Sequence, residues 1–551
     1  MQVVKEKDKL IITFPYNVVL LAAVRMIPGR DFNKTKKHWS APLTQIVTVY
    51  RILQPFGFVF DEACFELYKN AVILQKKVVR LKSGAFKDIE AQMIKDLELP
   101  LYMYQQIGAG FLAAIGSGLI GDQPGLGKTI QSLAATELKK TKKNLIFCPV
   151  SMKKTWQEEI EKWLPHKTSI IIGGDVKQRT KLWSKDVNYY ICNYHLLLRD
   201  LKFMKDINWD FILADEATTI SNSKAKTTKN LKKIKAKRRI AMTGTPLNNT
   251  LQDIWSIMDW TQPGILGTYW HFTEEYCLKD KHGAISGFKN LHKLAAMLDT
   301  FMLRRLKSDV LHELPPKVFE NVYVEFSPEE RKIYETIKEG TAEELKHIDM
   351  FDKKFLSDAL VKMIRLKQAT CSLELINGQE TSSKVDALKE LLSHILVDGQ
   401  KTIIFTQFRE MAVLLMRILA EYKPLLIAGG VSQEERDANR HAFNTDDVHQ
   451  ILIMTSAGAM GLNLQRASSV IHYDLPWSIS ALEQREDRAH RHGQKKSVTI
   501  YRMIVENSID EYILKILHKK KKIADDVLGD NTKDTVKKVS LSRTDVKNIL
   551  G

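Results

Sequence analysis

Two series of short apolar runs, separated by helical patterns, constrain the fold of this chain more than any other feature of its sequence. The runs are rich in β-branched or apolar residues and end in small polar loops, which is the alternation typical of parallel α/β domains. We predict strands at 144–149, 168–172, 189–192, 209–213 and 239–242 in the first half, and at 402–405, 425–427, 451–454, 470–473 and 498–503 in the second. The pattern therefore predicts an α/β protein with two similar parallel-sheet lobes.

The remaining segments of this 551-residue chain, which is too long for one hydrophobic core, differ in character from the two series. Between 252 and 390 the sequence becomes helical and rich in Leu, Lys and Glu, as expected of an insertion and connector between lobes. Before Leu99 it alternates, for example in Lys9-Leu-Ile-Ile-Thr-Phe-Pro-Tyr16 and Val78-Val-Arg-Leu-Lys82, which predicts a small α+β module. We expect domains at 1–95 (N-terminal module), 96–260 (first lobe), 261–385 (helical insertion and connector), 386–525 (second lobe) and 526–551 (C-terminal tail).

Composition places the chain among ordinary globular proteins, with 44% hydrophobic and 27% charged residues. No apolar run reaches the ~18 residues that span a bilayer, and the segment after Met1 lacks the apolar core of a signal peptide. We therefore expect no membrane association and a cytoplasmic location, or a nuclear one in a eukaryotic cell. The five cysteines are scattered singly, without a His or Cys cluster at zinc spacing, so we expect free thiols and no structural metal.

The charge balance favours a polyanionic partner. Lysine and arginine number 83 against 65 aspartate and glutamate residues, which gives a formal net charge of +18. Neutralised phosphates release condensed counterions, so nucleic acid is a natural partner, although a basic solvated surface would give the same net charge. The run 224–239 is almost purely basic, and a solvated face competes there with a contact to a nucleic-acid backbone.

A glycine-rich loop, Asp122-Gln-Pro-Gly-Leu-Gly-Lys-Thr129, follows the apolar stretch 111–120 and leads into a helical run at 130–138. Gly125 and Gly127 allow backbone N–H groups to turn toward a β-phosphate, and the helix N-terminus adds partial positive charge. Lys128 would reach the β and γ oxygens, and the Thr129 hydroxyl would ligate Mg²⁺. Asp122 stands where the strict motif has its first glycine, so a plain glycine-rich turn at a helix start remains the alternative. We include Asp122 in the predicted nucleotide site.

Two further segments place polar groups directly after predicted strands. In Phe211-Ile-Leu-Ala-Asp-Glu-Ala-Thr218, Asp215 would hold Mg²⁺ through water, and Glu216 could orient or deprotonate the water that attacks the γ-phosphate. Acidic pairs also cap helices, so this signal gains its weight from the glycine-rich loop. In Arg239-Ile-Ala-Met-Thr-Gly-Thr-Pro246, Thr243 and Thr245 could report hydrolysis to a nucleic-acid track, while a simple loop start is the alternative.

The longest signal has three parts: Thr455-Ser-Ala-Gly-Ala-Met-Gly-Leu-Asn-Leu464, then Tyr473-Asp-Leu-Pro-Trp477, and then Glu483-Gln-Arg-Glu-Asp-Arg-Ala-His-Arg-His-Gly-Gln494. Arg488 and Arg491 lie three residues apart, on one face if the segment is helical, so both guanidinium groups can point the same way. An arginine finger stabilises charge on a transferring phosphoryl group, a role worth ~10³–10⁵ in rate. Taken alone, the segment would read as a salt-bridged surface helix.

In their order along the chain, these motifs resemble those of Swi/Snf-type ATPases of helicase superfamily two. The resemblance also includes Phe301-Met-Leu-Arg-Arg305 with Lys307, Leu314-Pro-Pro-Lys317 and the Gly-Leu-Asn-Leu that begins at Gly461, and it covers roughly 99–517. It implies two RecA-like lobes with ATP and Mg²⁺ between them, each lobe gripping double-stranded DNA. It also implies that Gln105 reads the adenine edge and that Gly461 belongs to the nucleotide site. The segments around Pro149-Val-Ser-Met152 with Trp156, and Thr406-Gln407-Phe408, resemble those that touch the DNA backbone or support the lobes.

The N-terminal segment resembles the HARP-type module of annealing helicases. The resemblance rests on Ile11-Ile-Thr-Phe-Pro-Tyr16, Ile27-Pro-Gly-Arg-Asp-Phe32 and Lys37-His-Trp-Ser-Ala-Pro42. It implies contacts with forked or junction DNA, and hence strand annealing or fork remodelling in replication, repair or recombination. Arg30, Lys37 and Trp39 combine positive charge with an aromatic ring, as in single-strand or junction binding. The alternative is that Phe32 and Trp39 belong to the core of a small domain.

The sequence departs from the family pattern at Gln123-Pro124 (usually Glu-Met), at Thr218 (usually His) and at His492 (usually Ile). None of these changes removes a predicted phosphate, metal or arginine ligand, although Thr218 puts the coupling of ATP to DNA in doubt. We therefore predict a DNA-stimulated ATPase and duplex translocase; the compact plan would suit a bacterial or viral member. Two alternatives stay open: an RNA-directed helicase of the same superfamily, and a DNA-binding recruitment module whose ATPase has decayed. The sequence names no protein partner.

Overall fold

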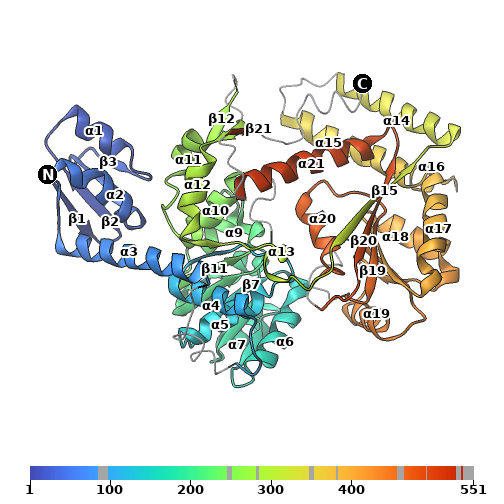
Figure 1. The fold of residues 1–551 in the computed structure, drawn as a ribbon, viewed down its shortest axis with the longest axis horizontal. Helices are drawn as coiled ribbons and strands as arrows, with labels where there is room; N and C mark the ends of the chain where they lie inside the picture. Colours follow the sequence, from blue (N-terminus) through green and yellow to red (C-terminus); the bar gives the residue numbers. More distant parts are fainter. Residues whose placement is uncertain are drawn as a thin grey trace. The chain divides into compact units, whose positions relative to one another are not determined.

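The computed structural model describes residues 1–84, 97–244, 251–280, 285–346, 353–379, 382–455, 464–491, 493–528 and 535–537. The chain forms two compact units: Met1–Leu306 with Asp526–Lys538, and Lys307–Asp525 with Val539–Gly551 (Figure 1). Each unit is built on its own parallel sheet, so the predicted α/β class is confirmed. Within the described ranges, no helix combines the length and the apolar character needed to cross a bilayer.

The N-terminal module of the first unit has one mixed sheet, in the order β3-β4-β2-β1-β5, and three helices. Its pairs are antiparallel except β1 with β5. Leu10 and Ile12 alternate along β2 and enter a core that also holds Val24 and Val49, which is the α+β arrangement expected. The elements are β1 (Gln2–Glu6), β2 (Lys9–Thr13), α1 (Val18–Arg25), β3 (Asp31–Asn33), β4 (His38–Pro42), α2 (Ile46–Leu53), β5 (Val59–Phe60) and α3 (Glu62–Lys82).

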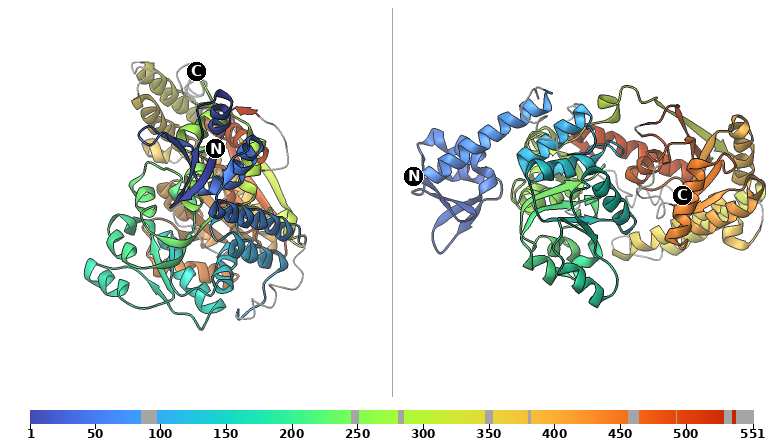
Figure 2. Two further views of the ribbon diagram at one scale, coloured as in Figure 1. Left: turned by 90° about the vertical axis from the view of Figure 1, so that its left-hand side faces the viewer. Right: turned by 90° about the horizontal axis from the view of Figure 1, so that it is seen from below.

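The long helix α3 corrects one detail of the sequence analysis. Asp61 caps it, because its Oδ1 accepts from the backbone N–H of Cys64 at 2.7 Å. The helix then runs as one continuous element of 21 residues (Figure 2). Val78-Val-Arg-Leu-Lys82 is therefore its last turn, not an alternating segment, and only Val78 and Leu81 of that turn are buried.

The first lobe is a parallel sheet in the order β14-β6-β11-β10-β7-β9-β8. Every strand predicted in the first half of the chain is present, and β6 and β14 complete the sheet. Its strands are β6 (Gly118–Ile120), β7 (Asn144–Cys148), β8 (Ser169–Ile171), β9 (Tyr189–Asn193), β10 (Trp209–Ala214), β11 (Ala236–Met242) and β14 (Met302–Leu303). Its helices are α4 (Met103–Ile115), α5 (Lys128–Leu138), α6 (Lys153–Trp163), α7 (Val176–Trp183), α8 (Leu201–Asp206) and α9 (Lys226–Leu231).

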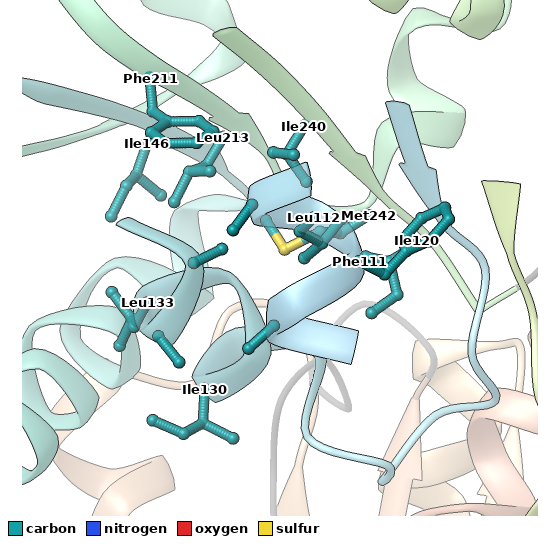
Figure 3. Close-up of a cluster of buried hydrophobic side chains, with 14 of the residues drawn as sticks. Phe111, Leu112, Ile120, Ile130, Leu133, Ile146, Phe211, Leu213, Ile240 and Met242 are labelled. Atoms are coloured by element: carbon teal, nitrogen blue, oxygen red, sulfur yellow. The ribbon is translucent and has the colours of Figure 1, made fainter. Parts of the chain in front are cut away.

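One face of this sheet packs against α4, α5 and α6 (Figure 3). Ile146, Leu213 and Ile240 come from neighbouring strands and meet Leu112 and Leu133 of the helices in one buried cluster. This packing fixes the start of α5, and therefore the loop that precedes it, relative to the strand ends.

The segment after β11 contains strands as well as helices. The order is α10 (Leu251–Thr261), α11 (Tyr269–Tyr276), β12 (Cys277–Lys279), β13 (Ile285–Lys289) and α12 (Leu291–Asp299). A strand from the end of the chain, β21 (Thr535–Lys537), pairs antiparallel with β13. Past α12 the chain returns to the first lobe as β14, which pairs with β6 at the edge of the sheet.

The second unit carries a parallel sheet in the order β15-β20-β19-β16-β18-β17, and it contains every strand predicted in the second half. Its strands are β15 (Lys317–Val324), β16 (Lys401–Thr406), β17 (Leu425–Ile427), β18 (Ile451–Thr455), β19 (Ala467–His472) and β20 (Val498–Val505). Its helices are α13 (Lys307–Val310), α14 (Pro328–Lys346), α15 (Lys353–Cys371), α16 (Glu374–Asn377), α17 (Ser383–Ile395), α18 (Arg409–Ile418), α19 (Gln433–Thr445), α20 (Ile479–Glu486) and α21 (Ile509–Leu528).

Successive residues of the central strands enter two different cores. Ile404 packs with residues of α17 and α18, whereas Ile403 and Phe405 pack with Phe443 of α19. Both faces of the sheet are therefore covered by helices, which explains why its strands read as continuous apolar runs.

Candidate nucleotide-binding site

The glycine-rich loop joins β6 to α5, which begins at Lys128. Gly125 and Gly127 adopt positive φ angles of 89° and 76°, a conformation that residues with a Cβ rarely accept. A Cβ on Gly127 would also lie 2.5 Å from Nε2 of Gln105. Local backbone geometry and close packing therefore both require glycine at this position.

Lys128 lies across the loop that precedes it. Its Nζ donates to the carbonyl oxygens of Asp122 at 2.7 Å and of Gln123 at 3.3 Å. Its positive charge also acts on Asp215, where it opposes the rise in pKa that burial causes. Lys128 and Asp215 were predicted to share a site, and the structure brings them within electrostatic reach of each other.

The side chain of Asp122 is fully buried and serves an internal ion pair. Arg305 grips both carboxylate oxygens, with Nε donating to Oδ1 at 3.1 Å. Gln131 donates to Oδ2 at 3.2 Å and accepts from Arg305 at 2.7 Å. The residue in the place of the first motif glycine thus contributes its carbonyl to Lys128 and its carboxylate to Arg305.

Asp215 and Glu216 follow directly after β10. Trp156 of α6 donates its indole N–H to Oδ2 of Asp215 at 2.9 Å, and the backbone N–H of Glu216 donates to Oδ1 at 2.9 Å. Burial raises the pKa of Asp215, and the Trp156 hydrogen bond opposes that shift. Glu216 has a φ of 48°, which turns the chain sharply after the strand.

The strand β11 lies between β6 and β10 in the sheet, so its end reaches the same edge. The buried Thr243 donates its backbone N–H to the carbonyl of Ile120 at 3.1 Å. Beside it, a Cβ on Gly244 would lie 2.7 Å from Cγ of Pro124 in the glycine-rich loop. Three motifs therefore meet at the carboxyl edge of one parallel sheet, as is usual for ligand sites in such folds. Thr245 lies outside the described residues.

Gln105 lies in the first turn of α4, beside the glycine-rich loop. Its Oε1 accepts from the backbone N–H of Tyr102 at 3.2 Å, and its Nε2 faces Gly127. Its predicted contact with an adenine ring remains a prediction.

The two predicted arginines of the second unit do not lie on a helix. The helix α20 ends at Glu486, and Arg488 and Arg491 follow in turns. The condition for a shared helical face is therefore not met, because the segment is held by turn bonds such as the one from the Arg488 N–H to the carbonyl of Arg485 at 3.3 Å. Gly461 and His492 lie outside the described residues.

Two lysines, the buried Lys307 and the partly buried Lys317, hold the segment that carries these arginines. Asp487, immediately before Arg488, contacts Nζ of Lys307 at 2.8 Å and of Lys317 at 2.9 Å. The pKa of Asp487 is held below its usual value by the two ammonium groups, which outweigh its burial. The sequence analysis quoted both lysines as parts of motifs but gave them no role.

A second carboxylate, Asp474, organises the Thr406-Gln407-Phe408 segment. It accepts from the Thr406 hydroxyl and from the backbone N–H of Gln407 at 2.8 Å. Arg485 donates to its carbonyl at 2.9 Å, and Lys367 of α15 lies 3.6 Å from its Oδ1. The segment is thereby tied to both the sheet and the helical connector.

The predicted DNA contacts of the N-terminal module lie on or near the β3–β4 hairpin. Trp39 is half-buried and packs against the module's core, and its ring is tilted 45° to that of the exposed Phe32, with centroids 5.1 Å apart. Lys37 is exposed at the hairpin tip with a φ of 52°. Arg30 donates to the carbonyl of Ile27 at 3.0 Å, and burial and the nearby Arg25 lower its pKa.

The basic run 224–239 is partly accounted for by pairs inside the first lobe. Lys232 pairs with Asp259, and Lys237 Nζ lies 2.8 Å from Oδ1 of Asp210. Arg239 donates to the carbonyl of Trp260 at 3.3 Å.

The protein has two α/β lobes with parallel sheets, and one lobe carries a glycine-rich loop beside an acidic pair. These features place it in the general class of nucleotide-binding α/β proteins. Comparison with protein families is more specific. Residues 60–375 match the SNF2-related domain, and 383–493 match the helicase conserved C-terminal domain. Since the first match covers more than half of the chain, the chain belongs to the SNF2-related family. Residues 1–59 lie outside both matches.

Curated relatives include an uncharacterized ATP-dependent helicase of Mycoplasma genitalium, 30% identical over 465 residues, which cover 82% of this chain and 44% of that protein. A similar helicase of Mycoplasma pneumoniae is 33% identical over 442 residues, covering 77% of this chain and 42% of the relative. The chromatin-remodeling ATPase of the ISWI complex of Saccharomyces cerevisiae is 29% identical over 466 residues, with coverages of 79% and 41%. The chain spans less than half the length of these relatives.

Among solved structures, the chain is similar to the SWI2/SNF2 ATPase core of Sulfolobus solfataricus in complex with double-stranded DNA. The TM-score is 0.40 and the identity 29%, and the match covers 79% of this chain and 94% of that one.

Proposed function

We propose that this chain is an ATP-hydrolysing motor that moves along duplex DNA. The observation that carries the proposal is the meeting of three family motifs at one sheet edge, where Gly127, Lys128, Asp215 and Thr243 lie on adjacent strand ends. Membership of the SNF2-related family supports ATP as the nucleotide. The related Mycoplasma and yeast proteins bear the names of ATP-dependent helicases and of a remodelling ATPase.

The residues at this edge fit a nucleoside triphosphate with Mg²⁺. The positive φ angles of Gly125 and Gly127 would let the loop turn its backbone N–H groups toward a phosphate. The Thr129 hydroxyl and the Asp215 carboxylate are the oxygen ligands that Mg²⁺ prefers, and the bound ion would neutralise charge on the β and γ phosphates. Lys128 would bind the same phosphates, and Glu216 would orient or deprotonate the attacking water.

The remaining assignments extend this proposal. Arg488 and Arg491 would stabilise the charge that develops on the transferring phosphoryl group. Gln105 would contact the adenine. Asp122 would support the loop, Gly461 would contact the nucleotide, and Thr243 and Thr245 would pass the state of the site to DNA.

DNA is the partner that the charge of the chain supports best. The formal net charge is +18, and the β3–β4 hairpin exposes the lysines of its tip. We propose that this tip, with Arg30 and Trp39 beneath it, contacts forked DNA, and that the motor acts in strand annealing or fork remodelling during replication, repair or recombination. A cytoplasmic location, or a nuclear one in a eukaryotic cell, would follow.

We also propose the domain limits 1–95, 96–260, 261–385, 386–525 and 526–551. The two compact units meet in sequence between Leu306 and Lys307, which falls inside the proposed connector.

The test is ATP hydrolysis by the wild type and by Lys128→Ala, without nucleic acid and with duplex DNA, forked DNA, single-stranded DNA or RNA. The exposed Lys142 supplies a control variant, Lys142→Ala. We expect stimulation by duplex or forked DNA that is lost in Lys128→Ala and kept in Lys142→Ala. Stimulation by RNA alone would favour an RNA-directed helicase, and tight DNA binding without hydrolysis would favour a recruitment module with a decayed ATPase.

A further inference from the structure

Two basic residues of the connector, Arg305 and Lys307, are separated by the single residue Leu306, where the two compact units meet in the chain. Arg305 forms a buried ion pair in the first unit, and Lys307 forms one in the second. The acidic partner in each pair belongs to a motif of the proposed ATPase. Asp122 begins the glycine-rich loop, and Asp487 directly precedes Arg488.

In the first unit, Arg305 reaches the glycine-rich loop through Asp122. The Asp122 carboxylate is fully buried, and the Arg305 side chain is only 12% exposed. Asp122 in turn gives its carbonyl oxygen to Nζ of Lys128 at 2.7 Å. Arg305 and Lys128, the lysine proposed to bind phosphate, therefore both contact Asp122.

Gly108 of the helix α4 lies directly against the side chains of Gln131 and Arg305. A Cβ on Gly108 would lie 1.7 Å from Oε1 of Gln131 and 2.9 Å from Arg305. Arg305 also donates to the carbonyl of Tyr104, one helical turn before Gly108. A larger residue at this helical position would displace the ends of the Gln131 and Arg305 side chains, so Gly108 leaves room for the Arg305 network although helices disfavour glycine.

In the second unit, Lys307 reaches the arginine segment through Asp487. Nζ of Lys307 lies 2.8 Å from Oδ1, and both side chains are 6% exposed. The same Nζ donates to the carbonyl of His490, which immediately precedes Arg491. Lys307 therefore contacts the residues directly before both proposed phosphate-stabilising arginines.

Lys317 and Pro315 complete the attachment. Nζ of Lys317 contacts Asp487 at 2.9 Å and Glu486 at 3.0 Å, and Nε2 of His490 lies 2.8 Å from the carbonyl of Pro315. Past the end of α20 at Glu486, these contacts add to the backbone bonds of the turns, such as the His490 N–H to the carbonyl of Glu486 at 3.1 Å.

Buried ion pairs contribute little net stability when desolvation offsets their attraction, but their geometry is specific. We propose that Arg305 and Lys307 are positioning residues of the ATPase: on one side of Leu306, Arg305 fixes the glycine-rich loop through Asp122, and on the other side, Lys307 fixes the arginine turns through Asp487. This inference rests on the proposed ATP hydrolysis. It predicts that each residue affects a different kinetic constant.

The first test uses Arg305→Lys, which keeps the charge but loses the two-pronged grip on Asp122. We expect the affinity for a fluorescent ATP analogue to fall about tenfold and KM for ATP to rise in parallel, because the glycine-rich loop is less well held. The surface-exposed Arg417, paired with Glu374, gives the matched control Arg417→Lys. Unchanged analogue binding in Arg305→Lys would overturn the role of Arg305.

The second test uses Lys307→Met, which preserves the length of the side chain. We expect kcat to fall by about 10²-fold while analogue binding stays within about twofold of the wild type, because only the arginine turns are displaced. The exposed Lys515, which lies 3.8 Å from Glu511, gives the control Lys515→Met. Thermal unfolding separates displacement from collapse, and a folded Lys307→Met with wild-type kcat would overturn the role of Lys307.

A pH profile supplies a readout that a purely structural role would not move. Burial lowers the pKa of Lys307 to about 8. The charged or titratable groups that face it are Asp487, Lys317, Arg491 and His490. We expect kcat of the wild type to decline above that pH as Lys307 loses its charge, and Lys307→Arg, which stays charged, to lose this decline. The same decline in both proteins would contradict the role of Lys307.

The double variant Arg305→Lys/Lys307→Met tests whether the two residues act separately. Because each forms its ion pair in its own unit, the double variant should lose the product of the two single losses in kcat/KM. A loss that departs from this product by much more than about twofold would overturn the assignment of separate roles. Absence of hydrolysis in the wild type would overturn the proposed function itself, while analogue binding would still report on Arg305.

Discussion

Replacement of Gly127 by alanine tests how far the glycine-rich loop depends on its backbone geometry. The φ of 76° puts alanine in the left-handed region, at a cost of about 1–2 kcal/mol. The new Cβ would also lie 2.5 Å from Nε2 of Gln105, so the amide must move. That movement gives up the bond from the Tyr102 N–H, at 3.2 Å, which contributes about 1 kcal/mol. The combined cost of about 2–3 kcal/mol corresponds to a 30- to 150-fold loss of binding if all of it falls on the bound conformation.

Gly378 provides a matched control for the backbone part of this cost. Its φ is 79°, and a Cβ there meets nothing within 4 Å. We expect Gly378→Ala to lower the thermal midpoint slightly and to leave nucleotide binding unchanged. In the Gln105→Ala background, Gly127→Ala should cost about fivefold less affinity than in the wild type, because the bond from Tyr102, about 1 kcal/mol, is already absent there.

The assay is titration with a fluorescent ATP analogue, with thermal unfolding in parallel. Binding to Gly127→Ala at wild-type affinity would refute the reasoning, since both the strained φ and the contact with Gln105 would then have no consequence. Equal loss of binding in Gly378→Ala would refute it in another way, because the effect would be global.

Three further predictions concern an acidic ligand, a buried pair and the DNA surface. Trp156→Phe removes the donor to Asp215, and we expect the Mg²⁺ concentration for half-maximal hydrolysis to rise about tenfold or more. Lys384→Met leaves Asp510 buried without its partner at 2.6 Å, which should cost about 3–5 kcal/mol and lower the thermal midpoint. Alanine at the three lysines of the 34–37 hairpin tip should weaken binding to forked DNA and reduce the slope of log K against log salt by up to about 3.

Each of these has a contradicting result. An unchanged Mg²⁺ titration in Trp156→Phe would mean that the indole bond does not orient Asp215. A thermal midpoint for Lys384→Met equal to that of Lys515→Met would show that the buried lysine contributes no more than a surface one. A salt slope unchanged by the hairpin substitutions would place the DNA contacts elsewhere.

The parallel sheets could be predicted from the sequence because their strands are buried on both faces. Strands such as 451–454 are continuous apolar runs between polar loops, a pattern that survives without knowledge of the tertiary structure. The edge strand β15 was not predicted, since most of Lys317–Val324 is exposed and carries Glu320 and Asn321. Its exposed polar residues interrupt the apolar pattern, so local sequence does not separate this strand from the connector.

The loops of the candidate site could be predicted from the sequence, but the buried ion pairs that hold them in place could not. Lys128, Asp215 and Thr243 follow strands within recognisable motifs, whereas Arg305 pairs with Asp122 across 183 residues of sequence. No local pattern signals a contact of that separation. The end of α20 at Glu486 could not be predicted either. The turn that follows is fixed by ion pairs between Asp487 and two lysines that are far away in the sequence.

Comparison of two buried pairs in the first unit separates positioning from simple packing. Arg179 and Asp200 are as deeply buried as Arg305 and Asp122, with side chains 6% and 3% exposed and Nε to Oδ2 at 2.8 Å. Asp200 also accepts from the indole of Trp183, and its partners join α7 to the turn before α8, away from the glycine-rich loop. Both pairs pay a similar desolvation cost, so loss of either arginine should destabilise the fold to a similar degree. Only Arg305 lies one residue from the carbonyl that holds Lys128, so only its loss should change KM for ATP in protein that remains folded.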